Sequence, residues 1–173
     1  MRQHESIPGT IRVLALASLF IHGISNPVNA QNREAERAAI NNVLDGVHDA
    51  ADKGDFDRYF SLFTDDGVFL GTDATERWPI EEFKAYSKPH FEDGHGWTYT
   101  VDERHVDFTP DGNSAWFDEL LTNANLGTCR GSGVLVRVGG QWKVAQYNLT
   151  IPIPNGLASQ VVGLVREASA DGM

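Results

Sequence analysis

Several polar side chains in the second half of the chain are spaced two residues apart, as are the residues on one face of a β-strand. Asp118 lies two residues after Trp116, and Gln146 and Asn148 follow Trp142 at the same spacing. Because successive side chains of a strand point to opposite faces, residues spaced by two lie on one side of a sheet. A wall of apolar rings with a few convergent polar groups is the usual lining of a small-molecule pocket. We therefore expect these even-numbered side chains to line one pocket.

Asp118 is the candidate for proton transfer in that pocket. On an apolar face its carboxyl group would be poorly hydrated, which suits a general acid or base. His105 could act with Asp118 as a dyad, and Arg130 could stabilise an anion through its planar guanidinium group. The alternative is that Asp118 and Arg130 form an internal ion pair across adjacent strands.

The expected ligand-binding residues are rings that form a wall and polar groups that orient the ligand. They are Trp116, Tyr86, His90, Gln146 and Asn148. The two amides could instead bond to groups inside the protein, because buried amides seldom go unpaired.

Residues of the opposite parity are expected outside the pocket. Glu119 should lie in solvent, and Tyr147 should lie at a sheet-to-sheet contact between two copies of the chain. Gly131 and Gly133, which have no side chain, indicate a bulge or a place where a ligand or the backbone approaches closely.

The elements that must position these residues are helices first and strands afterwards. Apolar residues at three- and four-residue spacing predict helices, and alternation with turn signals predicts strands. The expected elements before the sheet are a helix over 32–53, a short helix capped by Asp55, a turn over 64–67, a short strand over 68–70, an irregular stretch over 71–78 and a helix that opens at Pro79 and kinks or ends at Pro89. They are followed by strands over 97–109 and within 114–150 and by a closing helix over 157–168.

This order predicts an α+β fold of one domain. Runs of helices followed by runs of strands are typical of that class. We expect a cone-shaped, strongly curved mixed or antiparallel sheet wrapped around the N-terminal helices, with one open end. The domain would span residues 31–173, a length that can bury a core without disulfides.

The first 30 residues have the order of a secretory signal peptide. Arg2 and Arg12 are basic, Val13 to Ile21 is apolar, and small residues precede Gln31. We expect cleavage near Ala30 and a secreted or periplasmic product. A membrane-anchoring or disordered N-terminus is the alternative.

Composition limits the partners that the chain can bind. The formal net charge is −10, and an acidic chain without a basic patch argues against nucleic acid and anionic membrane surfaces. Cys129 is the only cysteine, so no internal disulfide can form. No metal-ligand spacing occurs, and we expect neither a metal nor another cofactor.

Several short motifs together resemble the SnoaL-like branch of the nuclear transport factor 2-like superfamily. They are Lys53-Gly54-Asp55, Asp66-Gly67-Val68-Phe69, Asp111-Gly112 and Trp142-Lys143-Val144. The resemblance covers nearly all of residues 34–168. It implies an α+β cone that is often dimeric through its sheet. Members include isomerase-, dehydratase- and cyclase-type enzymes and non-catalytic association modules.

Together these observations predict an exported protein that binds a small hydrophobic or aromatic molecule in a partly hydrophobic pocket, as a homodimer. Any catalysis would be cofactor-free acid–base chemistry of the isomerase, dehydratase or cyclase type. The alternative is a non-catalytic association module that dimerises or binds a partner through its sheet face.

Overall fold

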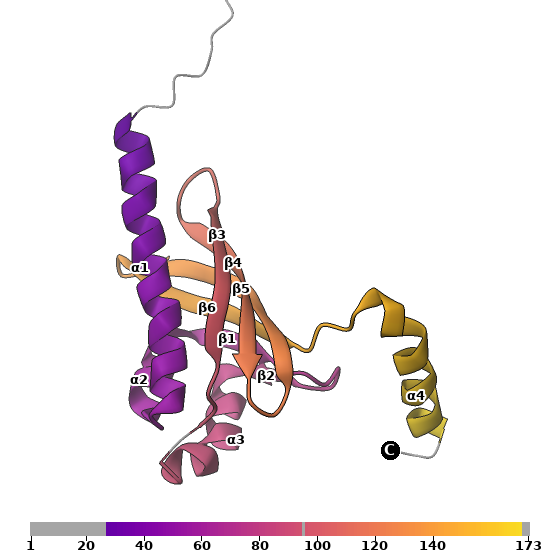
Figure 1. Cartoon of the computed structure of the whole chain (residues 1–173). Helices are drawn as coiled ribbons and strands as arrows, with labels where there is room; N and C mark the ends of the chain where they lie inside the picture. The colour runs from indigo at the N-terminus through magenta and orange to yellow at the C-terminus, as the bar shows by residue number, and fades with distance from the viewer. Residues whose placement is uncertain (1–26, 95, 171–173) are drawn as a thin grey trace, which may run out of the picture.

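The computed structural model describes residues 27–94 and 96–170 of the 173-residue chain (Figure 1). The predicted signal peptide therefore lies outside the described residues, apart from 27–30, which open the first helix. The helices are α1 (Pro27–Asp52), α2 (Phe56–Ser61), α3 (Ile80–Glu92), the 3₁₀ turn η1 (Asn155–Leu157) and α4 (Ala158–Ala170). The strands are β1 (Phe63–Leu70), β2 (Arg77–Pro79), β3 (Thr100–Phe108), β4 (Ser114–Asn123), β5 (Gly127–Val138) and β6 (Gln141–Thr150).

The six strands form one mixed, curved sheet in the order β2-β1-β6-β5-β4-β3. Strands β3 to β6 run antiparallel as a meander, and β1 pairs parallel to β6. Figure 1 shows α1 lying along one face of the sheet, with α2 and α3 at one end. This confirms the predicted α+β cone with an unclosed sheet.

The first three helices form where the sequence predicts them. In α1 the apolar stripe is buried, with Ile40 and Leu44 both fully inaccessible. Asp55 caps α2, because its carboxylate accepts a hydrogen bond from the Arg58 backbone N–H at 3.2 Å. Pro79 immediately precedes α3, but Pro89 lies inside that helix instead of ending it.

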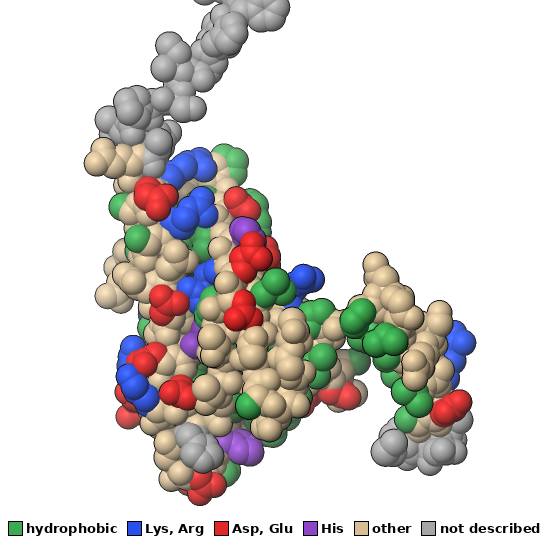
Figure 2. Space-filling model, in the orientation of Figure 1, with side chains coloured by type: hydrophobic (Ala, Val, Ile, Leu, Met, Phe, Trp, Pro, Cys, Tyr) green, Lys and Arg blue, Asp and Glu red, His purple; other side chains and the backbone are tan. Residues whose placement is uncertain are grey.

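Two parts of the fold differ from expectation. β1 begins at Phe63, so the segment predicted as a turn before Val68 belongs to the strand, and β2 pairs with β1 in a stretch predicted as loop. The closing helix α4 does not cover the sheet. Figure 2 shows its hydrophobic side chains along the side that faces the rest of the molecule, and Leu164 and Val165 are 58% and 59% exposed.

One irregularity in β6 decides which side chains enter the core. Val134 of β5 pairs with Gln146 and its neighbour Leu135 pairs with Val144, which leaves Ala145 as an unpaired extra residue. Such a β-bulge bends its strand. As a result, Tyr147 and Leu149 face inward on the same side as Val144.

None of the helices in the described part of the chain is both long enough and apolar enough to cross a lipid bilayer.

Candidate functional site

Apart from Trp142, which is buried in the core, the predicted even-numbered residues of β4 and β6 share one face of the sheet, but that face is the outer one. His105, Asp118 and Asn148 lie in one row across the sheet. His105 pairs in register with Asp118, and Ser132 of β5 pairs with both Asp118 and Asn148. Asp118 and His105 are exposed and Asn148 is partly exposed. The prediction that Asp118 lines an interior pocket is therefore wrong.

The remaining residues of that prediction lie on the same outer face. Trp116 is 48% exposed, and Gln146 and Arg130 are also exposed. Leu120, not Asp118, is the register partner of Arg130 on β4. His105 bonds to Glu103 at 2.9 Å, so the expected dyad with Asp118 is not formed.

Two physical facts explain the reversed face. In β4 both alternating sets contain apolar and acidic residues, so periodicity alone does not choose between Trp116 with Asp118 and Phe117 with Glu119. In β6 the bulge at Ala145 breaks the alternation that connects Trp142 to Gln146. The inward set therefore begins with Trp142 and continues with Tyr147.

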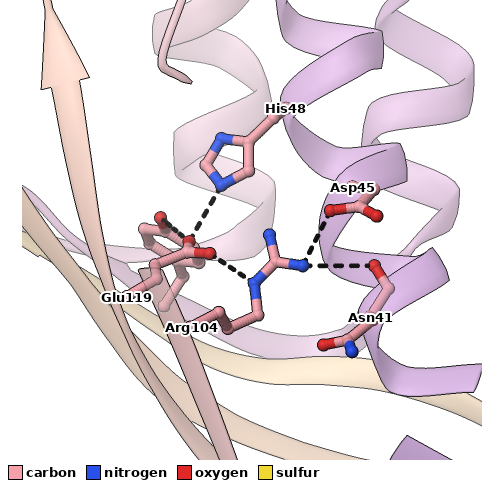
Figure 3. Close-up of polar contacts among 6 residues, drawn as sticks. Asn41, Asp45, His48, Arg104 and Glu119 are labelled. Atoms are coloured by element: carbon pink, nitrogen blue, oxygen red, sulfur yellow. Dashed lines mark hydrogen bonds and ion pairs between the residues drawn. The ribbon is translucent and has the colours of Figure 1, made fainter. Parts of the chain in front are cut away.

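Glu119, which was expected in solvent, is fully buried and lies at the centre of a polar cluster (Figure 3). One carboxylate oxygen, Oε1, lies 2.8 Å from Nε2 of His48 and accepts a hydrogen bond from the Tyr147 hydroxyl at 2.7 Å. The other, Oε2, accepts a hydrogen bond from Nε of Arg104 at 2.7 Å. The prediction for Tyr147 is therefore wrong, because this residue is buried in the protein and does not lie at a sheet-to-sheet contact.

Arg104 connects this cluster to α1. Arg104 and Glu119 are direct register partners on β3 and β4, and the Arg104 side chain is only 8% exposed. Its Nη1 donates to Asp45 at 2.7 Å and to the Asn41 carbonyl at 3.4 Å. Figure 3 shows His48 and Arg104 reaching Glu119 from different elements. The helix and the sheet are thus joined by charged hydrogen bonds around one carboxylate.

The cluster holds Glu119 ionised. Burial opposes the charge and is the largest single influence, but hydrogen bonds and charge from His48, Arg104 and Tyr147 outweigh it and lower the pKa of Glu119 below its ordinary value. Burial, and then the nearby Glu119 charge, raise the pKa of Tyr147 well above its ordinary value. The pair is therefore a carboxylate with a neutral phenol that donates to it.

The protonation of His48 follows from the ionised carboxylate. An ionised carboxylate only accepts hydrogen bonds, so Nε2 of His48 must carry a proton and donate it. Among the described residues, no hydrogen-bond partner contacts Nδ1. In the neutral imidazole Nδ1 is then an available acceptor.

Gly131 makes room for the cluster. It is the register partner of Glu119 on β5, and a Cβ atom at this position would collide with the Tyr147 hydroxyl and with Glu119. Gly133 is similarly close to the Gln146 carbonyl beside the bulge. The prediction that these glycines mark a bulge or a close approach is confirmed.

An open cavity of about 180 Å³ lies at the end of the sheet beside α3. Its wall is mainly aromatic and includes Phe69, Trp78, Phe83, Tyr86, Trp97 and Tyr99. A second void of about 10 Å³, roughly the space that one water molecule needs, lies beside His48 and Tyr147. The two voids share Phe69, Trp97, Tyr99 and Leu149 as walls. These four side chains therefore lie between the cavity and the void beside the polar cluster.

Parallel rings connect the polar cluster with the cavity. Tyr147 stacks on Phe69 at an interplanar angle of 4°, and Phe69 stacks on Phe83 at 5°. The series continues through Tyr86 to Trp78, where the last two rings are 5.0 Å apart. Offset parallel stacking of this kind fixes ring positions. The rings thus form a rigid wall from Glu119 to the cavity.

Of the residues predicted to bind ligand, Tyr86 lines this cavity. The ring of His90 lies 5.6 Å from that of Tyr86, but His90 is not part of the cavity wall. A larger open groove of about 680 Å³ lies between α1 and the β5–β6 hairpin. In this groove Glu36 and Arg137 form an ion pair with each other, so neither charge is free to bind a ligand.

Nothing in the described residues groups three or more histidine, cysteine or acidic side chains in a way that could hold a metal ion. Cys129 is fully buried, and burial raises the pKa of its thiol.

His48, Arg104, Glu119 and Tyr147 were not selected from the sequence. One signal for His48 was available, because it lies four residues after Leu44 on the apolar stripe of α1. A histidine on such a stripe indicates a buried partner. No local pattern identifies Glu119 as that partner, since it is 71 residues away.

The comparisons with known proteins agree with this fold. The family model of the SnoaL-like domain matches residues 40–154. No functionally curated protein matches the chain at a significant level.

Similar solved structures cover most of the chain at low identity. A nuclear transport factor 2-like protein of unknown function from Pseudomonas putida has a TM-score of 0.60 and 15% identity, covering 70% of this chain and 90% of its own. A candidate scytalone dehydratase from Novosphingobium aromaticivorans also has a TM-score of 0.60 and 15% identity, with 72% and 89% covered. A candidate Ca/calmodulin-dependent kinase II association domain from Exiguobacterium sibiricum has a TM-score of 0.55 and 17% identity, with 70% and 96% covered. At these identities the similarity shows a shared fold.

Proposed function

The chain belongs to the SnoaL-like family of the nuclear transport factor 2-like superfamily, and on this premise we propose that it binds a small ring-containing molecule and catalyses cofactor-free proton transfer on it. The observation that carries the proposal is the hydrogen bond between Glu119 and His48, which leaves Nδ1 of His48 as an available base beside a void. A carboxylate that orients an imidazole is a common arrangement for a general base.

Glu119 acts in this proposal as the positioning residue. It fixes the tautomer and orientation of His48 and stabilises the imidazolium that forms when Nδ1 accepts a proton. Arg104 and Tyr147 keep the carboxylate ionised, so the proton remains on the imidazole and does not pass to Glu119.

Tyr99 is the candidate hydrogen-bond donor to the substrate. It lines both the outer cavity and the void beside His48, and its ring centroid lies 6.3 Å from that of His48. Burial, with a smaller contribution from Cys129, raises the pKa of Tyr99 to about 12. A phenol that stays protonated at neutral pH can donate a hydrogen bond to an oxyanion that develops on the substrate.

The size of the cavity limits the substrate. An apolar protein cavity of about 150 Å³ accepts a benzene molecule, so about 180 Å³ suits one ring with small substituents. The substrate reaches His48 when Trp97 and Tyr99, which separate the two voids, rotate.

The test is solvent deuterium exchange at the carbon next to the carbonyl of small cyclic ketones, followed by NMR. The wild-type protein should accelerate exchange of at least one ketone, and His48→Gln should lower that acceleration by about 100-fold or more. His105→Gln is the matched control, because His105 is exposed on the other face and should have no effect. Equal exchange by wild type and His48→Gln would reject His48 as the base.

The outer sheet face supports a second proposal, that two copies of the chain associate through it. Trp116 and Val138, which are 48% and 47% exposed, lie on strands of this face, and large exposed apolar side chains mark association surfaces. Sedimentation should show a dimer for wild type and a monomer for Trp116→Lys. A wild-type monomer at high concentration would reject this proposal.

We also propose that the chain is exported and loses residues 1–30, on the strength of the basic, apolar and small-residue order at its start. N-terminal sequencing of the secreted or periplasmic product should begin near Gln31. Recovery of the full-length chain from the cytoplasm alone would reject this.

A further inference from the structure

Glu76 carries the only formal charge in the lining of the 180 Å³ cavity, as far as the described residues show. The other polar side chains there are those of Thr72, Trp78, Tyr86, Trp97 and Tyr99. Within residues 27–94 and 96–170, no lysine, arginine or histidine belongs to this lining. The cavity thus combines one negative charge with an aromatic wall.

The carboxylate of Glu76 is held in place by its own loop. Its Oε2 accepts a hydrogen bond from the Asp73 backbone N–H at 3.1 Å, and its side chain lies so close to Gly71 that a Cβ atom there would collide with it. Glu76 is partly buried and lines the cavity. The loop of Glu76 thus holds its carboxylate toward Asp73 and Gly71.

Among the residues that the structure describes, no positively charged side chain pairs with Glu76. Within residues 27–94 and 96–170, none of the salt bridges includes it. A partly buried carboxylate without a cationic partner is less stable than a paired one. A cationic ligand would supply the missing charge.

The aromatic wall favours the same kind of ligand. Trp78 and Tyr86 stack at the cavity, and Trp97 and Tyr99 also line it. Aromatic rings attract organic cations through their negative faces, and groups of such rings bind quaternary ammonium ions. The net charge of −10 adds a long-range attraction for cations and a repulsion of anions.

We propose that this cavity binds a small organic cation, namely an amine or quaternary ammonium compound. The proposal rests on the proposed function only in taking this cavity as the ligand site. It specifies the class of ligand and does not require proton transfer by His48. Glu76 and the rings around it hold the cationic end of the ligand.

Isothermal titration calorimetry with choline and with its neutral carbon isostere, 3,3-dimethyl-1-butanol (called dimethylbutanol below), tests this directly. The two probes have nearly the same shape and differ in charge. Choline should bind the full mature chain at least about tenfold more tightly than dimethylbutanol. Equal affinity, preference for the neutral probe, or no binding of choline would overturn the proposal.

Two variants locate the binding. Glu76→Gln and Trp78→Leu should each weaken choline binding by about threefold or more and leave the binding of dimethylbutanol almost unchanged. Glu82→Gln is the control, because it removes the same charge from an exposed position on α3 that does not line the cavity. Equal weakening by Glu82→Gln would mean that choline responds only to net charge and would contradict a specific site.

The test of cation binding can be distinguished from the test of proton transfer. His48→Gln should abolish deuterium exchange on ketones and should leave choline binding intact, since His48 does not line the outer cavity. Loss of exchange with retained choline binding supports both proposals. Retained exchange in His48→Gln, with choline still bound, would overturn only the proposed chemistry.

Discussion

His48 Nε2 lies 2.8 Å from Glu119 Oε1, and this contact joins the C-terminal part of α1 to the middle of β4 across 71 residues of sequence. Glu119 is completely inaccessible, and the His48 side chain is 11% exposed. A buried carboxylate that has three donors on its two oxygens is costly to disturb, because each donor loses its partner when the charge is removed.

Replacing Glu119 should therefore destabilise the protein strongly. We expect Glu119→Gln to lower the free energy of unfolding by about 3 kcal/mol, since Arg104 would become a buried charge without its main partner. Urea unfolding followed by circular dichroism measures this. Glu82→Gln, on the exposed side of α3, should change the value by less than about 0.5 kcal/mol. A loss for Glu119→Gln as small as that control would contradict the buried cluster.

The same carboxylate should make stability depend on acid pH. The pKa of Glu119 is lower in the folded protein than its ordinary value of 4.5, so its ionised form is favoured by folding. Its contribution is complete above the unfolded-state pKa and is lost as the pH falls through the folded-state pKa. The free energy of unfolding of wild type should thus fall from about pH 5 toward about pH 3, and that of Glu119→Gln should fall less steeply. Parallel curves for the two proteins would reject this assignment.

Gly131 should not tolerate a side chain. In Gly131→Ala the added methyl group would collide with the Tyr147 hydroxyl and Glu119, and we expect a loss of about 2 kcal/mol in thermal or urea unfolding. Gly156→Ala is the matched control, because nothing lies within 4 Å of a Cβ atom at Gly156. If both variants are equally stable, Gly131 does not make room for the cluster.

The C-terminal helix should contribute little to the stability of the domain. Leu157, Val162, Leu164 and Val165 are each 46% to 59% exposed, and no side chain of α4 belongs to the hydrophobic core. A chain that ends at Pro154 should unfold within about 3 °C of the full chain in differential scanning calorimetry. A much larger decrease would mean that α4 packs on the domain in solution.

The order of elements, the first two helix positions and the sheet-forming segments could be predicted from the sequence, because they depend on local spacing and local caps. Asp55 at the start of α2 is one such case. The face of β4 that points inward could not be chosen, because Trp116 with Asp118 and Phe117 with Glu119 have the same alternation. Only contacts with distant segments of the chain determine which of these two pairs is buried.

The candidate site depends on such distant contacts. Glu119 is buried because Arg104 and His48 come to it from β3 and α1, and neither neighbour is apparent from the residues around Glu119. Tyr86 could be assigned to the cavity because α3 and its aromatic residues are a local pattern. Local pattern therefore placed Tyr86 at the cavity wall, wrongly added His90, and did not reveal the buried cluster around Glu119.

The unpaired Ala145 has a geometric consequence for the depth of the cone. The bulge absorbs this residue, so Val144 and Tyr147 face the same side although they are three positions apart. It also bends the strand. A chain with Ala145 deleted would have a flatter β6 and a shallower hollow between that strand and α3.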